Sequence, residues 1–167
     1  MRITVAGVGY VGLSLAVLLS QRHQVTAITT TEAKAEKLNQ FISPIQDDEI
    51  ERFFEEAREG SRKLNLHTTT DKEAAYCSTE LVIIATPTNY DDVHHFFDTS
   101  AVEDAIEWTL KVNPNVLMVI KSMLILPDFY TKRCPSLKPG RQTSRNTSSS
   151  DSVFPLFLYA SIICLAS

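Results

Sequence analysis

The stretch Gly7-Val8-Gly9-Tyr10-Val11-Gly12 constrains the fold of this chain more than any other feature of its sequence. It follows a short apolar run, Arg2–Ala6, and leads into a second apolar run, "LSLAVLLSQ". Glycines at this spacing between a strand and a helix permit a tight turn, a close backbone approach to a ligand and close helix–strand packing. The N-terminus of the helix offers N–H groups to phosphate. The sequence therefore predicts that Gly7–Gly12 bind the pyrophosphate of a dinucleotide; the alternative is a strand–helix turn without a ligand.

Apolar runs and helical patterns alternate from the N-terminus to Ser122. The expected strands are Arg2–Ala6, Gln24–Ile28, Lys63–Thr68, Leu81–Thr86 and Asn115–Ser122. The expected helices are the apolar run that ends near Arg22, Glu32–Phe41, Asp47–Gly60, Asp71–Cys77 and Ser100–Val112. This alternation is typical of a parallel sheet with helices on both faces. We therefore predict a doubly wound, Rossmann-like α/β domain over residues 1–122.

Two helices carry more detailed expectations. In the helix Glu32–Phe41, the spacing predicts that Ala35, Leu38 and Ile42 lie on one side. For the short helix that ends at Cys77, we expect Thr70 or Asp71 as the N-terminal cap.

Residues 123–167 differ in composition from the preceding part of the chain. Residues 1–122 contain 18 acidic and 11 basic residues, whereas residues 123–167 contain 2 acidic and 5 basic residues and four of the seven prolines. The segment 138–152 is rich in Ser and Thr and is expected to be disordered. The apolar run Val153–Ala166 is shorter than the ~20 residues that span a bilayer, so we expect no membrane segment. The sequence thus predicts a largely unstructured C-terminal tail.

A sheet of at most five strands would leave its last strand at an edge. We therefore expect the apolar residues of Val116–Ile120 and Val153–Ala166 to stay exposed and to promote association of the chain.

Composition also bounds function and location. The net charge of −4 gives no electrostatic argument for a nucleic-acid or membrane partner. Three cysteines without CxxC spacing, and a chain that leads directly from Met1 into a strand, favour a reducing cytoplasm. A group of acids and histidines has no spacing known from metal sites and is expected to form a solvated loop without a metal: Asp91, Asp92, His94, His95 and Asp98.

The second strand is followed by a residue that departs from the usual dinucleotide pattern. An acid normally stands about 20 residues after the glycines and binds the ribose hydroxyls, but this position is Thr29. A hydroxyl lacks charge-assisted hydrogen bonding, and it also lacks the repulsion that excludes a 2′-phosphate. Lys34 lies one helical turn away; alternatively, Glu32 replaces the acid after a shift of the loop.

A second group of candidate site residues follows the fourth strand. Thr86, Pro87 and Thr88 leave the carboxyl end of that strand, where ligands of such sheets bind. Turn formation would explain a Pro-Thr-Asn sequence equally well.

Five separated stretches resemble the N-terminal domain of the UDP-glucose 6-dehydrogenases, within the wider UDP-glucose/GDP-mannose dehydrogenase group: "RITVAGVGYVGLSLAVLLSQ", "EKLNQFISPIQDDEIE", "LVIIATPTNYDD", "FFDTSAVEDAI" and "VIKS". The resemblance covers residues 1–122 and implies NAD as cofactor. It also implies that Gly7–Gly12 bind the pyrophosphate, that Lys34 lies near the adenosine, and that Thr86–Thr88 and Ser122 line the cofactor. Thr29 stands where the family has aspartate.

The resemblance implies a reaction for the full-length family. Those enzymes oxidise UDP-glucose to UDP-glucuronate with NAD, capture the aldehyde on a cysteine, and form homo-oligomers. After Ser122 the family continues Thr-Ile-Pro-Val-Gly, whereas this chain continues Met123-Leu124-Ile125. Neither Cys134 nor Cys164 lies in a context like the family's cysteine motif, so no catalytic residue is assigned.

We interpret the chain as a truncated, inactive dehydrogenase whose residues 123–167 arise from out-of-frame translation. A stand-alone nucleotide-binding module without catalysis is the alternative. A complete small reductase is disfavoured because the tail offers no acid–base pair.

Overall fold

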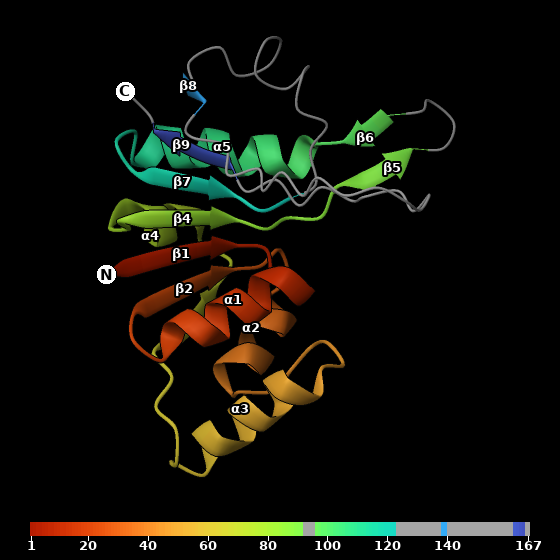
Figure 1. Ribbon diagram of the computed structural model, residues 1–167, viewed down its shortest axis with the longest axis vertical. Helices are drawn as coiled ribbons and strands as arrows, with labels where there is room; N and C mark the ends of the chain where they lie inside the picture. Colours follow the sequence, from red (N-terminus) through yellow and green to blue (C-terminus); the bar gives the residue numbers. More distant parts are fainter. Residues whose placement is uncertain (92–95, 123–137, 140–161, 166–167) are drawn as a thin grey trace, which may run out of the picture.

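The computed structural model of this 167-residue chain describes residues 1–91, 96–122, 138–139 and 162–165 (Figure 1). The strands are β1 (Arg2–Ala6), β2 (Gln24–Ile28), β3 (Leu66–Thr69), β4 (Leu81–Ile84), β5 (Asn89–Asp91), β6 (Phe96–Asp98), β7 (Leu117–Ile120), β8 (Lys138–Pro139) and β9 (Ile162–Leu165). The helices are α1 (Tyr10–Ser20), α2 (Glu32–Asn39), α3 (Asp48–Arg58), α4 (Lys72–Cys77) and α5 (Ser100–Val112).

One mixed sheet forms the centre of the molecule, with strand order β3-β2-β1-β4-β7-β9-β8. The first five strands in this order run parallel, which confirms the predicted fold class. Parallel neighbours need crossover connections, and α1 after β1, α2 and α3 after β2, α4 after β3 and α5 after β4 supply them.

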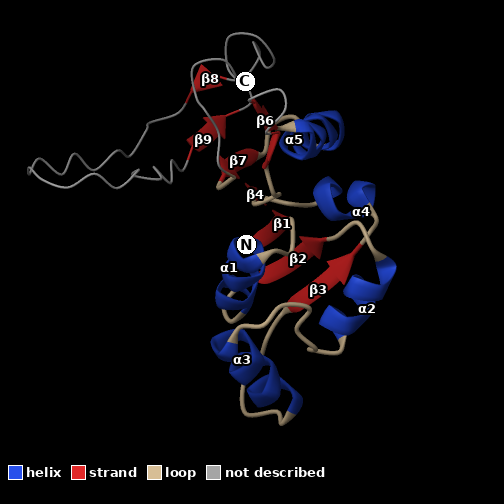
Figure 2. Ribbon diagram, turned by 90° about the vertical axis from the view of Figure 1, so that its right-hand side faces the viewer, coloured by secondary structure: helices blue, strands red, loops and turns tan. Residues whose placement is uncertain are grey.

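Helices cover both faces of the parallel strands. Figure 2 shows α1 on one side of the sheet and α4 and α5 on the other. The α1 side buries Ile3, Val5, Val25 and Ile83 with Ala16, and the opposite side buries a larger cluster: Ala6, Ile28, Ala75, Tyr76, Val82, Ile84, Val102, Ala105, Ile106, Val116, Met118 and Ile120. A third cluster joins α1 to α2 and α3 through Leu13, Val17, Leu38, Ile50 and Phe54.

Helices form at the five predicted places, although α2 and α3 each end two residues earlier than predicted, at Asn39 and Arg58. Asp71 caps α4, since its carboxylate accepts a hydrogen bond from the Ala74 N–H at 3.1 Å. Ala35 and Leu38 of α2 are buried, but Ile42 is 41% exposed, so the prediction that it shares their side is wrong. The reason is that α2 ends at Asn39 and the next turn places Phe41 at φ 55°, which removes Ile42 from the helical face.

A short ribbon replaces part of the loop expected after β4. β5 and β6 pair antiparallel, with Asn89 opposite Asp98 and Asp91 opposite Phe96. The expectation of a loop is therefore wrong at Asp91 and Asp98, while Asp92, His94 and His95 lie outside the described residues. Tyr90, Phe96 and Phe97 give this segment the aromatic content that favours strands.

The C-terminal segment extends the sheet beyond β7. β9 pairs antiparallel with β7, placing Ile162 opposite Ile120 and Leu165 opposite Leu117, and β8 pairs with β9. The parallel part of the sheet has the five strands expected, but the expectation that the sheet ends with β7 at an edge is wrong. Unpaired backbone groups of an apolar strand favour pairing with any available extended segment. The rest of Val153–Ala166 lies outside the described residues. Among the residues that the structure does describe, no helix is long and apolar enough to span a membrane.

Tyr76 has the largest side chain among the fully buried residues, and it lies under α5. Burial raises the pKa of its phenol to about 12; a hydrogen bond with Thr109 opposes this shift, and the charge of Asp104 adds to it. An unfolded tyrosine titrates near 10.0, so above that pH the folded state holds more protons than the unfolded state. The stability that the buried phenol contributes is thus present below pH 10 and is lost as the pH rises toward 12.

We predict that the wild-type chain loses about 2 to 3 kcal/mol more stability than Tyr76→Phe between pH 10 and pH 12. Urea unfolding at several pH values measures this difference. The exposed Tyr10 provides the control, because Tyr10→Phe removes a phenol outside the core. Parallel stability curves for the wild type and Tyr76→Phe would contradict the prediction.

The outer edge of β3 is closed by a side chain rather than by another strand. The Asn39 amide donates to the Thr68 carbonyl at 2.9 Å, and its oxygen accepts from the Thr68 N–H at 2.7 Å. One amide group thereby satisfies both backbone groups of Thr68, as a neighbouring strand would. This contact also fixes the C-terminus of α2 against the sheet.

We predict that Asn39→Asp lowers the free energy of unfolding by about 1 to 3 kcal/mol, because a carboxylate cannot donate to the Thr68 carbonyl. The new charge at the C-terminus of α2 acts in the same direction. Asn65→Asp is the matched control, since it makes the same chemical change on another exposed asparagine, whose side chain has no hydrogen bond within the described residues. Denaturant unfolding measures both variants, and equal losses would disprove the role of the Asn39 amide.

Candidate dinucleotide-binding site

The carboxyl ends of the parallel strands are aligned in one row. Ala6 of β1 pairs with Ile28 of β2 on one side and with Ile84 of β4 on the other. Ile28 pairs in turn with Thr69 of β3, and Ile84 with Ile120 of β7. The next residue of four strands donates a backbone hydrogen bond to this row: Gly7 N to Ile28 O at 3.1 Å, Thr29 N to Thr69 O at 3.1 Å, Ala85 N to Ala6 O at 2.8 Å and Lys121 N to Ile84 O at 2.7 Å. The segments that leave the strands are therefore held side by side.

The order of the strands reverses between β1 and β4. From β1 the chain reaches its neighbour β2 through α1 on one face, and it reaches β4 later through α4 on the other face. Such a reversal opens a crevice at the carboxyl ends of the two strands, which is the usual ligand site of open α/β sheets. In this chain the rule places the ligand site, called the crevice below, between the glycine turn and residues 85–88.

Gly7 and Gly12 are required by steric contact. Gly7 has φ +101°, and a Cβ there would lie 2.7 Å from the Ala85 carbonyl oxygen. A Cβ on Gly12 would lie 2.0 Å from the Gly7 carbonyl oxygen. The first turn of α1 therefore packs directly on the backbone of the glycine turn.

Gly9 has the opposite environment. It is exposed, and a Cβ built on it would meet no atom within 4 Å. Its φ of −78° places no demand for glycine on the backbone. The absence of a side chain at Gly9 therefore keeps space open in front of α1 without serving the fold.

The N-terminus of α1 has neither a capping side chain nor an acidic residue in its first turn. Its N-cap, Gly9, offers no side-chain acceptor, whereas α3 is capped by the Asp47 carboxylate, which accepts from the N–H groups of Glu49 and Ile50. Of the five helices in the described part of the chain, α1 alone has no acid in its first turn. Free N–H groups and the positive end of the helix dipole together favour a phosphate group at this place.

The segment after β4 forms the second wall of the crevice. The Ser122 hydroxyl donates to the Thr86 carbonyl at 2.6 Å and so connects the ends of β7 and β4. The Thr86 hydroxyl is buried and has no hydrogen-bond partner among the residues that the structure describes. Pro87 is exposed and Thr88 is half-buried. A buried hydroxyl without a partner fits a ligand that supplies one, because leaving such a group unpaired is unfavourable.

The predicted ribose position lies beside the glycine turn. The Gly7 N–H bonds to Ile28, so Thr29 leaves β2 directly next to the turn. Thr29 is only 6% exposed, whereas Glu32 and Lys34 are exposed on α2. Within the described residues no ion pair or side-chain hydrogen bond involves Lys34.

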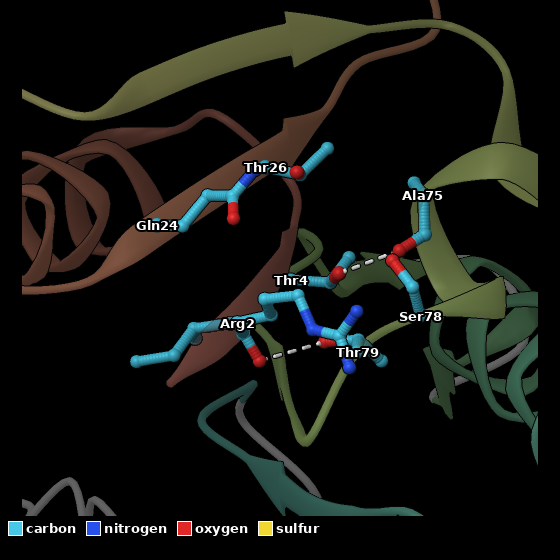
Figure 3. A pocket seen from close by; sticks show the side chains of 8 residues that line it. Arg2, Thr4, Gln24, Thr26, Ala75, Ser78 and Thr79 are labelled. Atoms are coloured by element: carbon cyan, nitrogen blue, oxygen red, sulfur yellow. Dashed lines mark hydrogen bonds between the residues drawn. The ribbon is translucent and has the colours of Figure 1, made fainter.

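Two hollows lie at the amino ends of the strands, away from the crevice. One has a volume of about 20 Å³, enough for a water molecule, and is lined by residues of β1 and β2 and by the connection from α4 to β4 (Figure 3). The hydroxyls of Thr4 and Thr79 already bond to backbone carbonyls there. The other hollow, of about 370 Å³, follows the starts of β2 and β3.

Other reactive groups are remote from the crevice or outside the described residues. Cys77 is exposed at the end of α4, near the amino end of β4. Cys134 lies outside the described residues, and Cys164 lies in β9. Among the residues that the structure describes, no cluster of His, Cys, Asp and Glu could hold a metal ion.

Sequence reasoning missed one participant, Ala85. Its backbone sets the closest approach to Gly7, but alanine after an apolar strand carries no recognisable signal. The contact follows from the adjacency of β1 and β4, which motif spacing does not reveal.

We predict that Gly9→Ala leaves the free energy of unfolding within about 0.5 kcal/mol of the wild-type value. The same change should weaken dinucleotide binding at least tenfold, because the methyl group fills the space in front of α1. Gly60→Ala is the control: Gly60 has φ +78° but is remote, so that change should cost stability without affecting binding. Calorimetric titration and denaturant unfolding separate the two effects. Unchanged affinity in Gly9→Ala would remove this space from the binding site.

Comparison with protein families identifies one match. The model of the UDP-glucose/GDP-mannose dehydrogenase family, NAD binding domain, matches residues 1–128.

Individual relatives agree with this match. A UDP-glucose 6-dehydrogenase of Streptococcus pneumoniae is 46% identical over 132 residues, which are 79% of this chain and 32% of that protein. One from Campylobacter jejuni is 36% identical over 134 residues. Among solved structures, a GDP-mannose dehydrogenase from Pseudomonas aeruginosa has a TM-score of 0.67 at 25% identity, over 80% of this chain and 30% of the other. This chain thus spans about a third of the length of the relatives that it matches.

Proposed function

The chain belongs to the UDP-glucose/GDP-mannose dehydrogenase family and contains its NAD-binding domain, and we propose that residues 1–122 are the cofactor-binding part of an enzyme that oxidises a nucleotide-linked hexose. The observation that carries this proposal is the uncapped N-terminus of α1, held by Gly7 and Gly12 against the backbone of Ala85. The similar proteins named as UDP-glucose 6-dehydrogenases suggest UDP-glucose as the substrate.

The residues divide into two ends of the site. Gly7, Val8, Gly9, Tyr10, Val11 and Gly12 form the pyrophosphate site. The free backbone N–H groups at the start of α1 bind the phosphates, whereas the Gly7 N–H is bonded to the Ile28 carbonyl and shapes the turn. Thr29 and Lys34 face the adenosine ribose, on the β2 side of the turn. Thr86, Pro87, Thr88 and Ser122 lie on the β4 and β7 side and hold the nicotinamide end. NAD, when bound, accepts the hydride that leaves the carbon of the sugar hydroxyl.

Cofactor binding alone does not produce turnover. Oxidation of an alcohol requires the reacting carbon to be held against the nicotinamide and a base to take the hydroxyl proton. The described thiol at Cys77 lies near the amino end of β4, and so does not supply a nucleophile to the crevice. We therefore expect the 167-residue chain to bind NAD without oxidising UDP-glucose.

The test combines binding with turnover on the purified chain. NADH titrated into the chain should give a saturable change in nicotinamide fluorescence, and Gly9→Ala should move its midpoint to at least tenfold higher NADH concentration. Incubation with NAD and UDP-glucose should produce no NADH absorbance above that of the buffer. Turnover that disappears in Cys134→Ser or Cys164→Ser would contradict this expectation and show that the C-terminal segment builds a working site.

A further inference from the structure

The residue after β2 decides which dinucleotide such a site accepts. An acid there binds the ribose 2′-hydroxyl of NAD and repels the 2′-phosphate of NADP, whereas a site for NADP accommodates the phosphate. In this chain the position is Thr29, which carries no charge. Resting on the proposed function, we infer that this site does not discriminate against the 2′-phosphate and binds NADP about as well as NAD.

Thr29 is the first residue after β2, which is the position of the acid in the usual pattern, and its backbone is held by the sheet. Thr29 follows Ile28, which pairs with Ala6 in β1 and with Thr69 in β3. Its N–H bonds to the Thr69 carbonyl at 3.1 Å, while the Gly7 N–H bonds to Ile28. The backbone is thus fixed on both sides, and a loop shift that would move Glu32 into this place would break the bond to Thr69.

The burial of Thr29 makes its neutrality important. The residue is 6% exposed and lies beside the turn that holds the phosphates. A carboxylate in such a place would act at short range with little screening by water. Its absence therefore removes both the strongest attraction for a ribose hydroxyl and the strongest repulsion of a phosphate.

The remaining charges nearby do not restore the discrimination. Glu32 and Lys34 lie in the first turn of α2, are exposed, and have opposite signs. Glu36 and Lys37 follow on the same helix and are also exposed and opposite in sign. Exposed charges act weakly because water and salt screen them. The segment 29–37 is therefore close to neutral in charge. An aspartate at position 29 would make it acidic.

The experiment compares NADH and NADPH on the full chain by nicotinamide fluorescence, in the wild type, Thr29→Asn and Thr29→Asp. Asparagine and aspartate have nearly the same shape, so the two variants differ only in charge and in the N–H donor that the amide carries. In the wild type and Thr29→Asn, we expect the Kd for NADPH to lie within about fivefold of the Kd for NADH. In Thr29→Asp, NADH should bind more tightly, and the ratio of the Kd for NADPH to the Kd for NADH should exceed about fiftyfold. The carboxylate forms a charged hydrogen bond with the ribose hydroxyl of NADH but repels the 2′-phosphate of NADPH.

The outcomes separate the two proposals. Binding of NADH with NADPH weaker by fiftyfold or more in the wild type overturns the inference and leaves the proposed function intact. No saturable signal with either cofactor overturns the proposed function itself. If burial of the aspartate prevents Thr29→Asp from folding, the wild-type ratio and that of Thr29→Asn still decide the inference.

Discussion

The contact between Gly7 and the Ala85 backbone determines the rest of the candidate site. At this place a side-chain atom would lie 2.7 Å from a carbonyl oxygen, so the turn after β1 can pass the end of β4 only as bare backbone. Gly12, in the first turn of α1, is constrained in the same way, because a Cβ built on it would lie 2.0 Å from the Gly7 carbonyl oxygen. These approaches fix the direction of α1, and with it the position of its free N–H groups relative to Thr86. The position of the candidate site thus follows from close backbone packing and not from polar side chains.

The fold of residues 1–122 could be predicted because each element is marked locally. Apolar runs such as that of β4, the Asp71 cap and the glycines after β1 each reflect a short-range preference. The predictions that proved wrong concerned features that depend on geometry beyond a single element. Ile42 left its expected side because the turn at Phe41 ends α2 early, and β9 joined β7 although its sequence lies far along the chain. Strand order was also beyond reach, because alternation of strands and helices does not specify which strands are neighbours.

The candidate site shows the same division. Spacing alone located the glycine turn, Thr29 and the segment after β4, because all three are defined by their distance from a strand end. The hydrogen bonds that unite them, from Gly7 to Ile28, Ala85 to Ala6 and Ser122 to Thr86, join residues that only the sheet brings together. Lys34 was placed near the adenosine by resemblance, and its side chain has no interaction in the described residues that tests this.

The two ends of the site tolerate change differently, and the reason is physical. At the phosphate end the backbone makes the site, so a substitution at Gly7 or Gly12 would displace β4 or α1 and cost stability as well as binding. At the ribose end the bond that fixes the chain is that of the Thr29 N–H to Thr69, which any residue except proline can make. The side chain of Thr29 is therefore free of a role in the backbone ladder. A single exchange there can alter the charge that the cofactor meets while the sheet, the turn and α1 stay in place. This arrangement allows the choice of cofactor to change without a change in fold.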